Sequence, residues 1–71
     1  MNGQVDLKKQ FGISVKARRN QLGLSQEDLA ERADLHRTYV SDVERGARNV
    51  SLQSIEKLAN ALEIPISALF L

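Results

Sequence analysis

The segment from residue 37 to residue 45 brings together side chains that can form hydrogen bonds with the edges of DNA bases. If the segment is a helix with Val40 and Val43 turned inward, its outward face is polar. Such a face fits the major groove, where arginine can pair with guanine and a threonine methyl group can contact thymine. The side chains that we expect to read bases are Arg37, Thr38, Ser41 and Asp42.

Asp42 differs from the other three because its carboxylate repels phosphate. If it contacts DNA, we expect it to accept a hydrogen bond from a base amino group such as cytosine N4. Nearby polar and basic side chains are candidates for phosphate contacts. They are Tyr39, Arg45, Arg48 and Asn49, with Lys16 and Arg18 as further candidates closer to the N-terminus. The plain alternative is that all these side chains form an ordinary solvated surface.

The residue types needed for catalysis or metal binding are scarce. The chain has one histidine, His36, and no cysteine, which argues against disulfides and against zinc sites of the usual kind. The sequence offers no nucleophile with a histidine base, no paired-carboxylate cleft and no glycine-rich phosphate loop. We therefore expect no enzyme activity, no metal, no cofactor and no small-molecule ligand.

Charge is distributed unevenly along the 71 residues. The net charge is only +1, but residues 1–24 hold five basic side chains and one acidic one, whereas residues 25–45 hold three basic and six acidic ones. Any contact with DNA must therefore be local. The sequence has no apolar run long enough to span a membrane, so we expect no membrane partner and a cytoplasmic location.

Short helices separated by tight turns must position these side chains. Apolar residues recur at helical spacing, which predicts helices over about residues 6–22, 25–33, 37–45 and 51–62. Pro65 suits the start of a short fifth helix. We expect one all-α domain over residues 1–71, with residues 1–5 as a flexible leader. The short turn between the second and third helices is typical of a helix-turn-helix.

Local signals mark the ends of these helices. Ser25 and Asp28 form a potential capping box at the start of the second helix, and Ser51 is a candidate cap for the fourth. Gly23 and Gly46 stand where helices commonly end in a left-handed residue. In the fourth helix, apolar residues form an inward stripe made of Leu52, Ile55, Leu58, Ala59 and Leu62.

Two motifs carry a resemblance to a known family. The run GLSQEDLA over residues 23–30, followed by YVSDVERG over residues 39–46, resembles the phage-repressor and Cro-type (Xre) helix-turn-helix family. The resemblance extends from about Phe11 to Phe70. Within it, the stretch from residue 36 to residue 49 is similar to the controller proteins of restriction–modification systems, which are small dimeric regulators.

The resemblance implies a lambda-repressor-like fold of five helices and several residue roles. Gln26 would anchor the start of the second helix to a phosphate, as orphan backbone N–H groups and the helix dipole favour. Arg19 and Glu44 would form a partly buried structural ion pair. His36 departs from the serine, threonine or aspartate that is frequent at its position, which weakens the expected cap of the third helix.

The C-terminal end is more apolar than the last helix of a monomer should expose. The resemblance implies a two-fold dimer interface there, for which the candidates are Ile64, Ile66, Leu69, Phe70 and Leu71. The expected function is that of a homodimeric transcriptional regulator, bacterial or phage in origin, on a two-fold symmetric operator in double-stranded DNA, with RNA polymerase as a further candidate partner. The alternatives are a protein-interaction module and an antitoxin-type autoregulator whose main partner is a protein.

Overall fold

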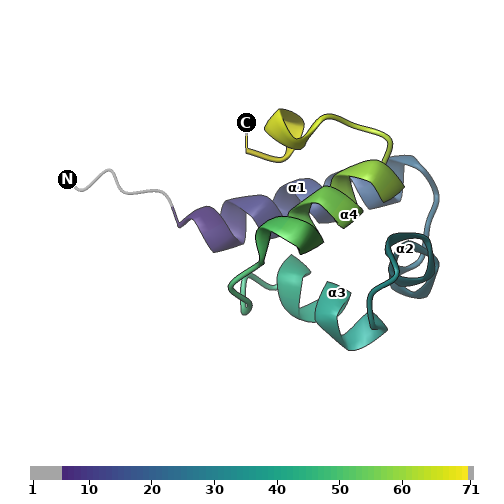
Figure 1. Cartoon of the computed structure of the whole chain (residues 1–71), viewed down its shortest axis with the longest axis horizontal. Helices are drawn as coiled ribbons and strands as arrows, with labels where there is room; N and C mark the ends of the chain where they lie inside the picture. Colours follow the sequence, from purple (N-terminus) through teal and green to yellow (C-terminus); the bar gives the residue numbers. More distant parts are fainter. Residues whose placement is uncertain (1–5, 71) are drawn as a thin grey trace.

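The computed structural model describes residues 6–70 and contains only helices in that range (Figure 1). The elements are α1 (Leu7–Gln21), α2 (Gln26–Ala33), α3 (Arg37–Glu44), α4 (Leu52–Ala61) and the 3-10 helix η1 (Ile66–Phe70). The all-α prediction is confirmed for this range. The expected leader over residues 1–5 lies outside it.

The predicted count of five α-helices is not confirmed, because the last element is a 3-10 helix. Its first turn closes with a hydrogen bond from the backbone N–H of Ala68 to the carbonyl of Pro65, at 3.0 Å. This i to i+3 pattern is the tighter winding that short C-terminal pieces adopt. Five residues are too few to gain much from the longer α-helical ladder.

Side chains cap three of the four α-helices at their first residues. Asp6 accepts hydrogen bonds from the backbone N–H groups at the start of α1, and Ser51 accepts one from Ser54 at the start of α4. Ser25 and Asp28 form the reciprocal capping box of α2. The hydrogen bonds from the backbone and the hydroxyl of Ser25 lower the pKa of Asp28. At the start of α3, by contrast, His36 makes no side-chain cap.

Helices α2 and α4 are followed by acidic residues in the left-handed conformation, with φ of 56° at Asp34 and 59° at Glu63. Each acidic residue pairs with a basic residue of the other helix. Lys57 of α4 lies 3.9 Å from Asp34, and Arg32 of α2 lies 3.7 Å from Glu63. The two helices are therefore joined by reciprocal surface ion pairs at their C-terminal ends.

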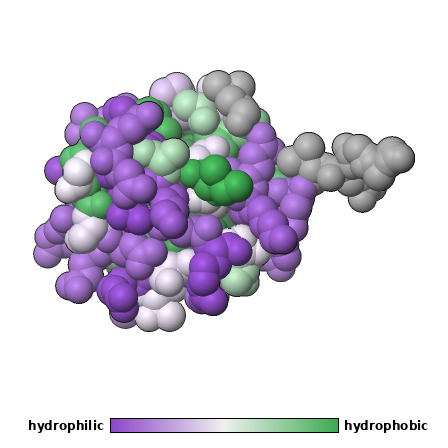
Figure 2. Space-filling view, turned by 180° about the vertical axis from the view of Figure 1, so that it is seen from behind, coloured by the Kyte–Doolittle hydropathy of each residue, from purple (hydrophilic) through white to green (hydrophobic). Residues whose placement is uncertain are grey.

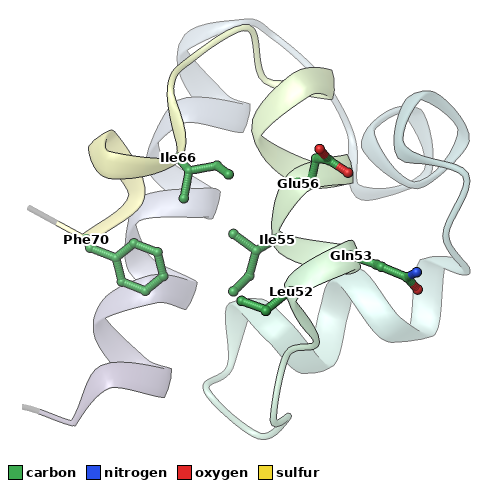
Figure 3. A pocket seen from close by; sticks show the side chains of 6 residues that line it. All are labelled: Leu52, Gln53, Ile55, Glu56, Ile66 and Phe70. Carbon is green, nitrogen blue, oxygen red and sulfur yellow. The ribbon is translucent and has the colours of Figure 1, made fainter.

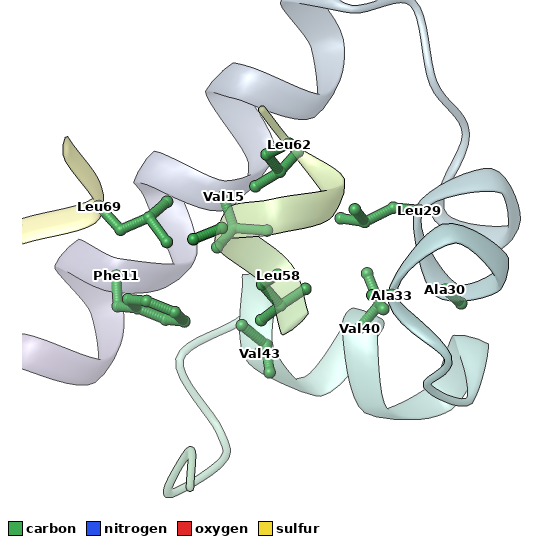
Figure 4. Close-up of a cluster of buried hydrophobic side chains, with 11 residues drawn as sticks. Phe11, Val15, Leu29, Ala30, Ala33, Val40, Val43, Leu58, Leu62 and Leu69 are labelled. Carbon is green, nitrogen blue, oxygen red and sulfur yellow. The ribbon is translucent and has the colours of Figure 1, made fainter. Parts of the chain in front are cut away.

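The core receives side chains from all five elements (Figure 4). Its buried members are Phe11, Val15, Leu29, Ala30, Ala33, Val40, Val43, Leu58, Ala59, Leu62 and Leu69. Most of the predicted stripe of α4 is buried, but Leu52 is 84% exposed, so its prediction as an inward residue is wrong. Leu52 is the first residue of α4, whereas the buried residues of this helix begin at Ser54.

Gly12 allows α1 to approach α3 closely. A Cβ atom at this position would lie 2.3 Å from the carbonyl oxygen of Val43 and 2.8 Å from that of Glu44. Both neighbours are backbone atoms, which cannot rotate away as a side chain can. The absence of a side chain at residue 12 therefore sets the distance between the two helices.

We expect Gly12→Ala to destabilise the fold by at least about 1 kcal/mol, even though alanine is intrinsically the better helix former. Thermal unfolding followed by circular dichroism measures the change. Asn20→Ala, at an exposed position of the same helix, is the matched control and should leave the melting temperature almost unchanged. Equal melting temperatures for the two variants would contradict the close approach of α1 and α3.

Candidate nucleic-acid interface

Helix α3 has a buried apolar side and an accessible polar side. Val40 and Val43 are almost completely buried in the core. Arg37 and Thr38, in the first turn, are exposed, while Ser41 and Asp42, one turn later, are half-buried. The structure thus places the four proposed base-reading residues on one helix, and the two at its N-terminal end are the more accessible ones.

The proposed phosphate-binding residues at the end of α3 and in the following loop contact one another. Asp42 accepts hydrogen bonds from the guanidinium groups of Arg45 and Arg48. The guanidinium of Arg48 also lies over the ring of Tyr39, with its central carbon 4.6 Å from the ring centroid. Asn49, the next residue in the loop, is exposed.

Gln26 is the first residue of α2, and its side chain is held by Glu44 of α3. Its side-chain amide donates a hydrogen bond to Oε1 of Glu44 at 3.1 Å. An amide nitrogen carries two hydrogens, so a second donor remains for an anion at the start of the helix. The sequence did not reveal this contact, because it joins residues 18 positions apart through the fold.

Arg19 and Glu44 form a bidentate, buried ion pair. Arg19 Nε lies 2.6 Å from Oε2 of Glu44, and Arg19 Nη2 lies 2.9 Å from Oε1. The side chains are only 11% and 3% exposed. Hydrogen bonding to Glu44 raises the pKa of Arg19 above its ordinary value. A third bond, from Arg19 Nη1 to the carbonyl of Leu24 at 2.8 Å, extends the pair to the turn before α2.

The two candidates on α1 differ in their surroundings. The guanidinium of Arg18 is engaged on the far end of α4, where Nε donates to the carbonyl of Leu62 at 3.0 Å. This bond helps to hold α1 against α4, and the role of Arg18 as a phosphate contact stays a prediction. Lys16 is exposed, and its spacing from Gly12 and Arg19 places it on the side of α1 that faces α3.

A second surface combines exposed apolar side chains from α4 and η1 (Figure 3). Leu52, Ile55, Ile66 and Phe70 point toward a shared hollow, and we call these four residues the apolar face. Ile66 and Phe70 are 46% and 40% exposed. The side of the molecule seen from behind Figure 1 is mostly hydrophilic, with scattered hydrophobic residues (Figure 2).

The structure places the residues of the predicted dimer interface in different surroundings. Leu69 is completely buried in the core of its own chain, so its assignment to the interface is wrong. Ile64 is half-buried against the core, and Leu71 lies outside the described residues. Leu52 and Ile55, which line the same hollow as Ile66 and Phe70, were not among the predicted interface residues. Helical spacing assigned both to the inward stripe and gave no sign that the start of α4 extends past the core.

Between residues 6 and 70, no cluster of three or more histidine or acidic side chains is placed to hold a metal ion. None of the helices in that range combines the length and the apolar character needed to cross a bilayer.

Comparisons with known proteins give consistent results. A family model described as "Helix-turn-helix" matches residues 15–69. Control protein C.BamHI of Bacillus amyloliquefaciens is 54% identical over 55 residues, which span 76% of this chain and 68% of the relative. The crystal structure of the restriction-modification controller protein C.AhdI from Aeromonas hydrophila superposes with a TM-score of 0.87 at 51% identity, covering 89% of this chain and 96% of the other.

A further solved structure contains DNA. It is the tetramer of the restriction-modification controller protein C.Esp1396I in complex with its natural 35 base-pair operator. It matches with a TM-score of 0.84 at 34% identity and covers 94% of this chain and 88% of that one.

We expect Glu44→Gln to lower the free energy of unfolding by about 3–5 kcal/mol, because it leaves the buried guanidinium of Arg19 without a counter-charge. Chemical denaturation followed by circular dichroism measures the loss. Glu63→Gln makes the same chemical change in the exposed pair with Arg32 and should cost less than about 1 kcal/mol. A Glu44→Gln protein as stable as the wild type would show that the pair does not stabilise the fold.

Proposed function

Because the chain belongs to the helix-turn-helix family, we propose that it is a sequence-specific regulator of transcription that binds double-stranded DNA as a homodimer. The observation that carries the proposal is the two-sided character of α3. Its two valines are buried in the core, while its polar side remains accessible. A recognition helix needs this arrangement, since base edges are read by side chains held on a rigid scaffold. In this role the chain, as one domain, acts by binding and not by catalysis.

Base recognition starts at the N-terminal end of α3. There Arg37 can form a bidentate pair with guanine O6 and N7, and Thr38 can contact a thymine methyl group or a phosphate. Ser41 and Asp42 follow one turn later and meet the groove at its edge. These two half-buried side chains have less freedom to adjust than Arg37 and Thr38.

Phosphate contacts on both sides of α3 orient it in the groove. At one side, the free donor of Gln26 and the backbone N–H groups at the start of α2 can hold one phosphate. At the other side, the hydroxyl of Tyr39, the guanidinium groups of Arg45 and Arg48 and the amide of Asn49 can reach the neighbouring backbone. Lys16 adds a positive charge from α1. These contacts fix the register of the helix without selecting a sequence.

The apolar face supplies the dimer contact. A two-fold interface brings the same surface of both chains together, so the four residues of the apolar face meet their own copies, with Ile64 beside them. Such a dimer places the two recognition helices about 34 Å apart, one turn of DNA. The operator is then expected to be two-fold symmetric.

The biological role that fits best is that of a controller protein in a restriction–modification system, located in the cytoplasm. The sequence similarity to C.BamHI and C.AhdI supports this role. The structural match to C.Esp1396I in complex with its operator supports it as well. A controller that changes transcription at its operator lies beside the site of RNA polymerase, which is therefore a second expected partner. The similarity favours this role over a protein-interaction module or an antitoxin.

We expect Arg37→Ala to lose discrimination at one base pair in each half-site, at a cost of about 1–3 kcal/mol for the preferred base. The measurement is selection of duplexes from a random pool near physiological salt, for the wild-type protein and the variant. Arg32→Ala, which removes an arginine outside the interface, is the control and should select the wild-type motif. If the wild-type protein enriches no sequence, the proposed function is wrong and the partner to seek is a protein.

We expect Leu52→Glu to dissociate the dimer, because it places a charge within the apolar face. The fold should survive, since residue 52 is exposed and glutamate is favourable in the first turn of a helix. Sedimentation velocity at micromolar concentrations gives the mass of each species. Ile13→Glu introduces the same charge at an exposed apolar position on α1 and should remain dimeric. A monomeric wild-type protein would contradict the proposed interface.

A further inference from the structure

The carboxylate of Asp42 binds two side chains that the proposed function assigns to DNA phosphates. Its Oδ1 accepts a hydrogen bond from Nη2 of Arg45, and its Oδ2 accepts one from Nη2 of Arg48 at 3.4 Å. Arg48 is held from a second side by the ring of Tyr39. The Asp42 side chain is only 22% exposed, whereas Arg45 and Arg48 are more accessible.

A carboxylate and a phosphate compete for the same donors. Both accept hydrogen bonds from the planar guanidinium group, and both pair with it electrostatically. A DNA phosphate that takes Arg45 or Arg48 through the same nitrogen must therefore displace Asp42 or share the donor with it. When Arg45 and Arg48 move from Asp42 to phosphates, the carboxylate is left unpaired next to negatively charged DNA. This state is unfavourable unless another hydrogen-bond donor replaces the arginines.

We propose that Asp42 determines specificity by holding Arg45 and Arg48 in the free protein, which weakens their contacts with the phosphates of non-operator DNA. The inference rests on the proposed function. On the operator, a cytosine amino group at the matching position gives the carboxylate a hydrogen bond when the arginines move to phosphates. On other DNA no such donor replaces them, so the cost of breaking the two ion pairs is not recovered. Asp42 thus discriminates mainly by penalising wrong sequences.

The test compares Asp42→Asn with the wild-type protein on two duplexes: the operator obtained by selection and a scrambled duplex of the same length and base composition. Affinity is measured over a series of salt concentrations. We expect the variant to bind the scrambled duplex about 3–10-fold more tightly, because two exposed ion pairs no longer compete with phosphate. The affinity for the operator should rise less than this or should fall. The ratio of operator affinity to scrambled-duplex affinity therefore decreases. The affinity of the variant for scrambled DNA should fall more steeply with salt concentration than that of the wild-type protein. The difference should correspond to about one additional released counterion for each arginine that is freed to contact a phosphate.

Two controls separate this mechanism from a change in net charge or in folding. Glu31→Gln also removes one negative charge, at an exposed position on α2. It should leave the ratio of operator affinity to scrambled-duplex affinity unchanged. In a protein that already carries Arg45→Ala and Arg48→Ala, Asp42→Asn should tighten binding to scrambled DNA clearly less than it does in the wild-type background, because only the repulsion between Asp42 and phosphate then remains to be relieved. A role limited to stability would instead lower the melting temperature and weaken both complexes equally.

The outcomes distinguish the two proposals. If the wild-type protein prefers its operator but Asp42→Asn leaves both the ratio and the salt dependence unchanged, Asp42 does not determine specificity and only this inference is overturned. The same holds if the gain on scrambled DNA is undiminished in the protein that lacks the two arginines. If the wild-type protein binds all duplexes equally, the proposed function is overturned and this inference falls with it.

Discussion

A guanidinium and a carboxylate withdrawn from water must satisfy each other, and Arg19 and Glu44 do so where α1, α2 and α3 meet. The pair fixes the end of α3 against α1, and its remaining hydrogen bonds reach the carbonyl of Leu24 and the amide of Gln26. The three helices of the proposed DNA-binding surface, α1, α2 and α3, are thus connected through one buried contact. Gly12 allows it, since the two helices could not approach so closely around a side chain at that position.

Features that depend on a few neighbouring residues could be predicted from the sequence. The capping box of Ser25 and Asp28, the cap at Ser51 and the inward valines of α3 are all present as expected. Features that depend on distant partners could not. Periodicity alone cannot tell that Leu52 lies beyond the core, that Leu69 lies within it or that Arg18 bonds the end of α4. Likewise, the bond between Gln26 and Glu44 exists only once α2 has packed beside α3.

The low net charge of the chain does not conflict with DNA binding once the surface is considered locally. The helix-turn-helix segment is acidic in composition, yet several of its carboxylates are engaged: Glu44 with Arg19, Asp28 with the start of α2 and Asp42 with two arginines. What remains accessible at the start of α3 is the uncompensated charge of Arg37. The placement of charge, and not its total, determines which side of the protein can approach a polyanion.

The left-handed residues after α2 and α4 have a consequence for how the sequence can vary. At Asp34 and Glu63 the conformation costs about 1–2 kcal/mol that glycine would avoid, while each residue's ion pair with the other helix returns at most about 1 kcal/mol. Replacement by glycine or asparagine therefore exchanges one small contribution for another of similar size. These two junctions are places of mutational robustness, where the sequence can drift without loss of the fold that presents α3.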